Sequence, residues 1–122
     1  MNDKKLTNQY KGTNGENVAA NFLLQKGYNI IERNWRYKHW EIDLIVSKEN
    51  KLHFIEVKTR TSKQFGNPEE SIGTKKMTAL KNGIEQYLLQ HTEWLLIQID
   101  VVAIIMNNEK VEEIFFIEDV FF

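Results

Sequence analysis

Two short apolar segments separated by a polar connection constrain the fold of this chain most strongly. They are residues 41–46 (Glu-Ile-Asp-Leu-Ile-Val) and residues 52–58 (Leu-His-Phe-Ile-Glu-Val-Lys), and the polar residues 47–51 lie between them. Paired β-branched runs around a short polar link are typical of a β-hairpin. The chain is therefore expected to contain at least one pair of adjacent antiparallel strands.

Charged side chains interrupt both of these apolar strands. Asp43 lies in the first strand, and Glu56 and Lys58 lie in the second. A charge in a buried strand is costly unless it is paired or holds an ion. A purely structural alternative remains open, in which Asp43 is a paired edge-strand charge and Glu56 and Lys58 form an ion pair on one face.

The remaining elements are expected on both sides of this hairpin. A capping-box spacing from Thr13 to Glu16 starts a helix, which Gly27 ends. The other predicted elements are a strand over 28–36, a helix from Ser71 or Thr74 to about His91, a strand over 94–105 buried on both faces, and a strand over 110–117.

This order, αβββαββ, predicts an α/β fold with a single mixed five-stranded sheet and flanking helices. The first three strands form an antiparallel meander, and the helical crossover makes the third and fourth strands parallel. Residues 1–11 are read as a polar N-terminal tail, and residues 12–122 as one domain. The 122 residues are about the length of one ordinary domain.

Composition excludes several classes of protein. The chain has no cysteine, which excludes disulfides, thiolate metal sites and thiol nucleophiles. No apolar run reaches the roughly 18 residues of a membrane span, and the N-terminus is polar. A soluble, cytoplasmic protein without membrane association is expected.

The net charge of −1 is unevenly distributed along the chain. Residues 57–81 carry six basic and two acidic side chains, and residues 99–122 carry one basic and six acidic side chains. A basic segment next to the hairpin could contact a polyanion, with Arg60, Lys75 and Lys76 as the candidate phosphate contacts. Simple solvation of these side chains is an equally open alternative.

The hairpin charges can converge on one site. Glu56 and Lys58 are two residues apart and share a strand face, and Asp43 on the neighbouring strand could lie beside them. Two carboxylates suit Mg²⁺ or Mn²⁺, and Lys58 could orient a water or offset phosphate charge. Glu16 could complete the ligand set, although it could also serve only as the helix cap.

Other polar residues are interpreted as structural. Asp100 interrupts an apolar strand and is read as a hydrogen-bonded core residue. The three histidines, His39, His53 and His91, have no metal-binding spacing. Glu41, on the same face as Asp43, is read as support or as a solvent-facing charge.

The series from Asp43 to Glu56-Val57-Lys58 resembles the core motif of the PD-(D/E)XK nuclease superfamily. A closer resemblance, to the uncharacterised bacterial YraN-like family, spans residues 12–103. Its motifs are Gly15-Glu16, Glu32-Arg33-Asn34-Trp35-Arg36, Glu41-Ile42-Asp43-Leu44-Ile45, Glu56-Val57-Lys58-Thr59-Arg60, Phe65-Gly66-Asn67-Pro68, Lys75-Lys76 and Asp100-Val101-Val102.

This resemblance implies a restriction endonuclease-like core, as in Holliday-junction resolvases. It implies metal-ligand roles for Asp43 and Glu56, a catalytic role for Lys58 and an accessory acidic role for Glu16. Resolvase-like relatives dimerise, so a homodimer is an expectation. Trp40 departs from the family pattern, which has glycine before Glu-Ile-Asp.

Two kinds of function remain open at this point. The first is a Mg²⁺- or Mn²⁺-dependent endonuclease that hydrolyses phosphodiester bonds in DNA, branched DNA included. The second is a catalytically silent nuclease-fold module for nucleic-acid binding or protein interaction. The apolar C-terminus, with Phe115-Phe116 and Phe121-Phe122, would suit a protein-interaction role.

Overall fold

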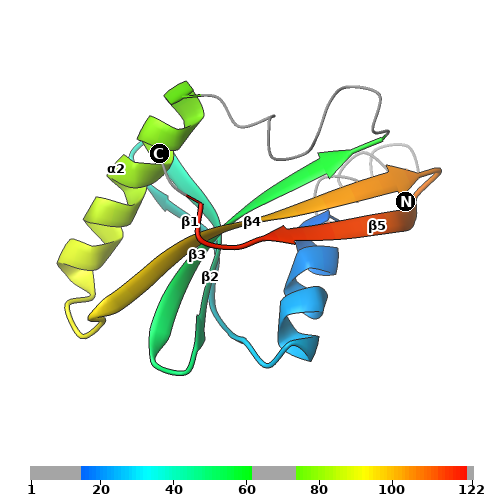
Figure 1. Cartoon of the computed structure of the whole chain (residues 1–122). Coiled ribbons are helices and arrows are strands. Elements are labelled where there is room, and N and C mark those ends of the chain that lie inside the picture. The colour runs from blue at the N-terminus through cyan, green and yellow to red at the C-terminus, as the bar shows by residue number, and fades with distance from the viewer. Residues whose placement is uncertain (1–14, 62–73, 121–122) are drawn as a thin grey trace, which may run out of the picture.

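The computed structural model describes residues 15–61 and 74–120, and these form a mixed sheet with a helix on each face (Figure 1). The predicted tail, the Thr13 cap, the segment from Phe65 to Pro68 and the Phe121-Phe122 end lie outside the described residues. The elements are a helix at 15–25, β1 (Asn29–Tyr37), β2 (Trp40–Lys48), β3 (Lys51–Arg60), α2 (Thr74–Gln90), β4 (Leu96–Asn107) and β5 (Lys110–Ile117).

The strands lie in the sheet in chain order, β1-β2-β3-β4-β5. β1, β2 and β3 are joined antiparallel, β3 and β4 run parallel, and β4 and β5 are antiparallel. The predicted α/β class, the order αβββαββ and the parallel crossover through α2 are therefore confirmed. Within the described residues no helix is long and apolar enough to cross a membrane.

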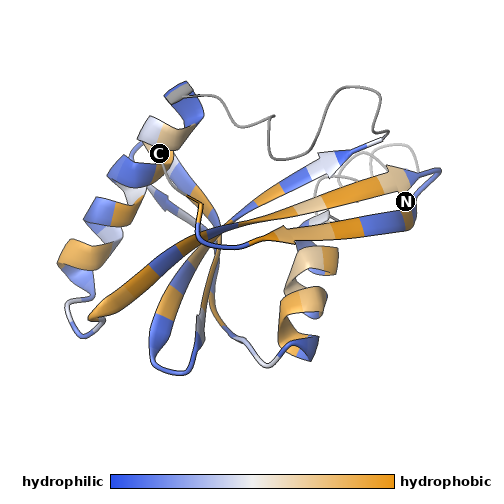
Figure 2. Cartoon of the chain, in the orientation of Figure 1, coloured by the Kyte–Doolittle hydropathy of each residue, from blue (hydrophilic) through white to orange (hydrophobic). Residues whose placement is uncertain are grey.

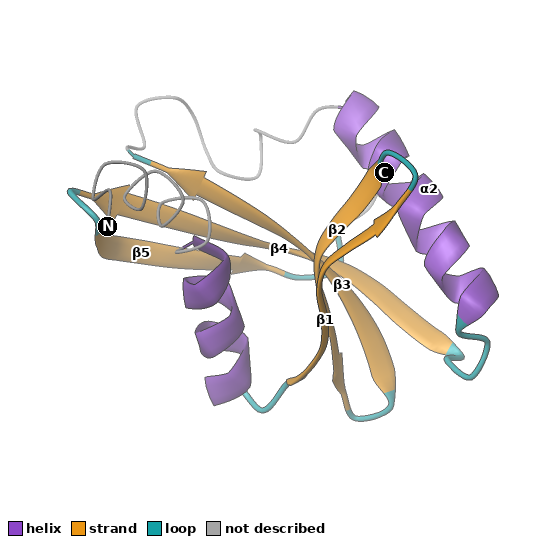
Figure 3. Ribbon diagram, turned by 180° about the vertical axis from the view of Figure 1, so that it is seen from behind, coloured by secondary structure: helices purple, strands orange, loops and turns teal. Residues whose placement is uncertain are grey.

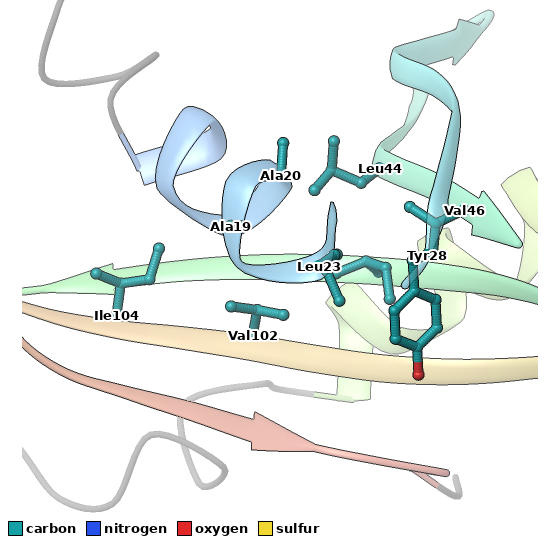
Figure 4. Packing of buried hydrophobic residues seen from close by; sticks show 9 residues of the cluster. Ala19, Ala20, Leu23, Tyr28, Leu44, Val46, Val102 and Ile104 are labelled. Atoms are coloured by element: carbon teal, nitrogen blue, oxygen red, sulfur yellow. The ribbon is translucent and has the colours of Figure 1, made fainter. Parts of the chain in front are cut away.

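Each face of the sheet carries its own apolar core, and Figure 2 shows apolar and polar residues interleaved along the helices and strands. On one face the N-terminal helix packs Ala19, Ala20 and Leu23 against Leu44, Val46, Ile55, Val102 and Ile104 (Figure 4). On the other face α2 packs Met77, Leu80, Ile84 and Tyr87 against Ile42, Ile45, Leu52 and Phe54. Fully burying a side chain of this size contributes about 1.5–3 kcal/mol, so each helix is held mainly by its apolar face.

The turn between β2 and β3 is shorter than the sequence indicated. β2 runs to Lys48 and β3 starts at Lys51, so only Glu49 and Asn50 form the loop, not the five residues 47–51. Both have positive φ, 51° and 66°, which is the backbone of a type I′ turn. This turn matches the right-handed twist of the strands, so the polar flanks can continue the ladder.

One prediction about β4 is wrong in part. Only residues 100–105 are buried on both faces, and the strand begins at Leu96, not at Trp94. Leu95 is 92% exposed, and Leu96 and Ile97 are also exposed. The N-terminal helix packs on β4 at Val102 and Ile104. The first residues of the strand lie outside this contact and are therefore exposed.

The sheet divides between β2 and β3. Their pairing ends at Leu44 and Ile55, although both strands continue. Beyond that point β2 pairs with β1 as far as Tyr37 and Trp40, and β3 pairs with β4 as far as Arg60 and Ile105. Figures 1 and 3 show the two halves diverging. We call this point the fork.

Candidate active site

The fork leaves one backbone donor of β3 without a partner strand, and Asp43 binds it. Asp43 Oδ2 accepts a hydrogen bond from the backbone N–H of Val57 at 2.8 Å. Because buried N–H groups need acceptors, this bond fixes the Asp43 carboxylate at the point where β2 and β3 separate. The sequence prediction that Asp43 lies beside the end of β3 is consistent with this position.

Glu56 is the second carboxylate at the fork. Continuing the β2–β3 register would place it opposite Asp43, and its side chain is only 5% exposed. The pKa of Asp43 rises from 3.8 to about 7 because burial disfavours its charge and because the Glu56 carboxylate is close. The Val57 hydrogen bond opposes this rise, and Glu16 adds to it.

A lysine from α2 balances the charge of Glu56. Lys76, in the first turn of the helix, forms an ion pair through Nζ with Glu56 Oε1. This oxygen is buried and receives no hydrogen bond of ordinary geometry within the described part of the chain. The Lys76 side chain is 50% exposed, so the counterion of this buried carboxylate oxygen is a half-solvated ammonium.

Lys58 and Lys76 share their environment at this site. Burial lowers the pKa of Lys58 to about 8, with further lowering by its hydrogen bond to Lys76 and by the charges of Lys76 and Arg60. Burial also disfavours the charge of Lys76, but hydrogen bonds with Glu56 and Lys58 outweigh it and raise the pKa of Lys76. Lys58 is therefore the lysine of this pair that loses its proton more readily, which suits a group that transfers protons.

The first turn of the N-terminal helix reaches the fork because of a glycine. Gly15 is buried, and a Cβ at this position would overlap Thr59 Oγ1 on β3. Close approach of the helix to β3 brings Glu16 near enough to contribute to the raised pKa of Asp43. The two helices thus reach the site from the two faces of the sheet, Glu16 from one and Lys76 from the other. We call Glu16, Asp43, Glu56, Lys58 and Lys76 the fork cluster.

The fork cluster differs from the predicted three-carboxylate ligand set. Among residues 15–61 and 74–120, no group of three or more His, Asp or Glu side chains is close enough to hold a metal ion. Asp43 and Glu56 form a close pair, and Glu16 acts on them at longer range. Of the candidate phosphate contacts, Arg60 is half-buried near Lys58, Lys75 is exposed, and Lys76 is engaged with Glu56.

A second buried polar group lies elsewhere on β3 and is fully partnered. His53 Nδ1 donates to Asp100 Oδ2 at 2.7 Å. Asp100 Oδ1 accepts from Gln98 Nε2 at 2.8 Å and from the backbone N–H of Asp119 at 2.9 Å. Asp100 is completely buried. We call this group the His53–Asp100 network, and it confirms the interpretation of Asp100 as a hydrogen-bonded core residue.

The other histidines and Glu41 also have structural contacts. His91 stacks on Tyr87, with ring centroids 4.1 Å apart, and His39 lies against Trp40. Glu41 forms an exposed ion pair with Arg36 at 3.4 Å. These side chains therefore stay outside the fork cluster.

Sequence reasoning missed the role of Lys76 beside Glu56. The signal that could have found it is topological. A right-handed crossover places α2 over the sheet face that Glu56 uses, and its first turn then starts near the end of β3.

Comparison with known proteins identifies close relatives. The model of the family described as "Uncharacterised protein family UPF0102" matches residues 15–104. A UPF0102 protein of Natranaerobius thermophilus is 42% identical over 95% of this chain and all of its own length. UPF0102 proteins of Flavobacterium psychrophilum and Chloroherpeton thalassium are 37% and 39% identical, over 91% and 94% of this chain and 92% and 95% of their own lengths.

Proposed function

The chain belongs to the uncharacterised protein family UPF0102, within the PD-(D/E)XK-like nuclease superfamily, and we propose that it is a Mg²⁺- or Mn²⁺-dependent endonuclease. Its reaction would be hydrolysis of phosphodiester bonds in DNA, and the fork cluster would be its active site. The relatives carry only the name of the family, so the proposal depends on the chemistry of the site.

One observation carries the proposal: two carboxylates at the fork are held together against their mutual repulsion. Burial and the nearby Glu56 carboxylate raise the cost of ionising Asp43, as the raised pKa of Asp43 indicates. Glu56 Oε1 is a buried oxygen that meets only an ammonium ion in the described part of the chain. Such a pair favours any cation that can approach both carboxylates.

The donor set fits magnesium or manganese. Mg²⁺ commonly binds through one or two carboxylates, several waters and substrate phosphates, so a third protein ligand is not needed. Asp43 and Glu56 would hold the ion directly, and Glu16 would add negative charge nearby. A bound divalent ion would polarise a phosphoryl oxygen and lower the pKa of a bound water.

The lysines supply the remaining chemistry. Lys58 has a pKa lowered to about 8, so near neutral pH it can both donate and accept a proton at the attacking water. Lys76 can turn from Glu56 toward a phosphate once another cation balances the carboxylates, because half of its side chain is already exposed. Arg60 and Lys75 would contact the flanking phosphates.

The test is Mn²⁺ binding by calorimetry on the wild type and on Asp43→Ala and Glu56→Ala. Glu41→Ala is the matched control, since Glu41 is a carboxylate on the same strand that pairs with Arg36 instead of facing the cluster. The two cluster variants should lose at least about 10-fold in affinity, equivalent to about 1.4 kcal/mol, and Glu41→Ala should bind as the wild type does.

The same samples should then be incubated with a panel of labelled linear and branched DNA. Cleavage that follows metal affinity across the four proteins supports the proposal. If the wild type binds no Mn²⁺ even with DNA present, the proposal fails. The chain would then be a catalytically silent member of the nuclease fold that acts by binding.

A further inference from the structure

The turn between β1 and β2 carries alternating cationic and aromatic residues. Residues 33–40 read Arg-Asn-Trp-Arg-Tyr-Lys-His-Trp and include no acidic residue. We infer that this hairpin binds the unpaired bases of single-stranded DNA, through stacked rings that we call the aromatic platform: Trp35, Tyr37 and Trp40. The inference rests on the proposed function, since it names the form of DNA that the fork cluster would act on.

The rings of the aromatic platform are nearly parallel. Trp35 and Tyr37 have ring centroids 6.3 Å apart and planes 9° apart, and Tyr37 and Trp40 have centroids 6.2 Å apart and planes 13° apart. All three side chains are half-buried, so each is fixed on one side and reachable on the other. His39 extends the platform beyond Trp40, with centroids 4.9 Å apart.

Helix α2 fixes the platform in place. Trp35 packs edge-on against the buried ring of Tyr87. A Cβ at Gly83 would lie 3.4 Å from Trp40 Cβ, an ordinary van der Waals distance, so Trp40 lies directly against this turn of the helix. Figures 1 and 3 both show the hairpin beside α2. Rigid aromatic faces lose little entropy when a base stacks on them.

One cation contacts the platform, and two arginines on the same strand add positive charge to the hairpin. The side chain of Arg36 is 71% exposed, although it also contacts Glu41 at 3.4 Å. Lys38 Nζ lies 5.6 Å from the centre of the Tyr37 ring, whereas the exposed Arg33 donates a hydrogen bond to Asn17 Oδ1 on the N-terminal helix. Aromatic faces combined with positive charge are the features that bind single strands without sequence preference.

The platform lies next to the fork along the same strand. Trp40 precedes Asp43 by three residues on β2, which is about 10 Å along a strand. A nucleotide stacked on Trp40 would therefore lie about 10 Å along β2 from Asp43, at the edge where β2 separates from β3. Bases within a duplex are already stacked on one another, so this arrangement favours a single-stranded segment over blunt duplex.

A simpler role for the rings makes a different prediction. Tyr37 and Trp40 are directly opposed across the strands, and such aromatic pairs stabilise hairpins without any ligand. Trp40→Leu keeps apolar packing against α2 but removes the aromatic face, and Trp40→Phe keeps both. The comparison of these two variants separates stacking on a base from packing within the fold.

The experiment measures fluorescence anisotropy of labelled (dT)₁₂ and of a 12-bp blunt duplex at low salt with EDTA, which prevents cleavage. Wild type should bind (dT)₁₂ more tightly than the duplex. Base–aromatic stacking of about 1–3 kcal/mol predicts that Trp40→Leu weakens (dT)₁₂ binding about 5- to 100-fold. Trp40→Phe should retain most of the affinity. Trp94→Leu is the control, since Trp94 is also half-buried but lies beside Asn50 and Leu95.

Equal (dT)₁₂ affinity of wild type and a folded Trp40→Leu would overturn the inference, and so would equal binding of duplex and single strand. Urea unfolding shows whether each variant is folded. The measurement is independent of metal, so Asp43→Ala should still bind (dT)₁₂. A wild type that binds (dT)₁₂ but no Mn²⁺ contradicts the proposed function alone. Duplex cleavage without single-strand preference contradicts the platform alone.

Discussion

Two buried polar side chains, His53 and Glu56, lie three residues apart on β3, and they are partnered in opposite ways. The His53–Asp100 network gives each carboxylate oxygen of Asp100 a donor, three donors in all. The fork cluster instead places Glu56 near Asp43, with a half-exposed lysine as its counterion. The positions of His53 and Glu56 differ by three, an odd number, so their side chains leave opposite faces of the strand.

The difference separates a carboxylate whose partners stabilise the fold from a pair of carboxylates that still need a balancing charge. A buried carboxylate with all its donors in place lowers the energy of one native arrangement. Two neighbouring carboxylates oppose folding until a proton, a lysine or a metal ion balances them. The fork cluster is therefore expected to be a site of low stability within a stable sheet.

The largest expected effect breaks the His53–Asp100 network. Asp100→Ala leaves three donors without their acceptor, one of them a buried imidazole, and should lower the unfolding free energy by about 3–5 kcal/mol. Urea denaturation measures this loss. Glu118→Ala, at an exposed carboxylate nearby, should change stability by less than about 0.5 kcal/mol. A loss below about 1 kcal/mol for Asp100→Ala would remove the contrast between the two groups.

A smaller effect is expected when the counterion at the fork is removed. Lys76→Met leaves Glu56 Oε1 buried without its ammonium and should cost about 1–3 kcal/mol in metal-free buffer. Saturating Mn²⁺ should stabilise this variant more than it stabilises the wild type, because the metal replaces the missing charge. Thermal unfolding with and without Mn²⁺ tests this. Equal metal stabilisation of both proteins would show that Lys76 and the metal do not compete for the same carboxylates.

The smallest effect concerns the charge on Asp43 itself. Its pKa is about 7 in the folded protein against 3.8 ordinarily, so the folded state holds the extra proton between those values. The unfolding free energy of metal-free wild type should fall as pH rises from about 4 to 7 and then level off. Asp43→Asn keeps an acceptor for Val57 but has no such titration, and should therefore be more stable than wild type at pH 8. A parallel pH dependence in both proteins would contradict this assignment.

Much of the fold could be predicted from local pattern. The β-branched runs before and after Glu49-Asn50 fixed the hairpin, and the helical apolar stripe from Met77 to Tyr87 fixed α2 and hence the parallel crossover. Both are periodic features of short segments, and this is the information that a single sequence carries well. The exposed start of β4 could not be predicted, since exposure depends on which helix covers which part of the sheet.

The main residues of the candidate site could be predicted from the sequence, but the groups that contact them could not. Asp43, Glu56 and Lys58 were identified because charges in apolar strands are conspicuous. The fork itself, the Asp43–Val57 hydrogen bond and the Lys76 ion pair depend on where strand pairing stops and where a helix begins. The hydrogen bonds of Asp100 with Gln98 and Asp119 could likewise not be predicted, because they depend on tertiary packing.

The parallel joining of β3 and β4 has a consequence for the order in which the chain can assemble. The bond between Asp43 and Val57 closes a separation of 14 residues, and the bond between His53 and Asp100 closes one of 47. Loop-closure entropy makes the longer closure costlier by about 1 kcal/mol, before any contact offsets it. The two carboxylates of the fork thus meet within a local hairpin, and the His53–Asp100 network forms only after α2 has carried β4 back across the sheet. The pair of fork carboxylates is in this sense the product of short-range folding, and the His53–Asp100 network is the product of long-range folding.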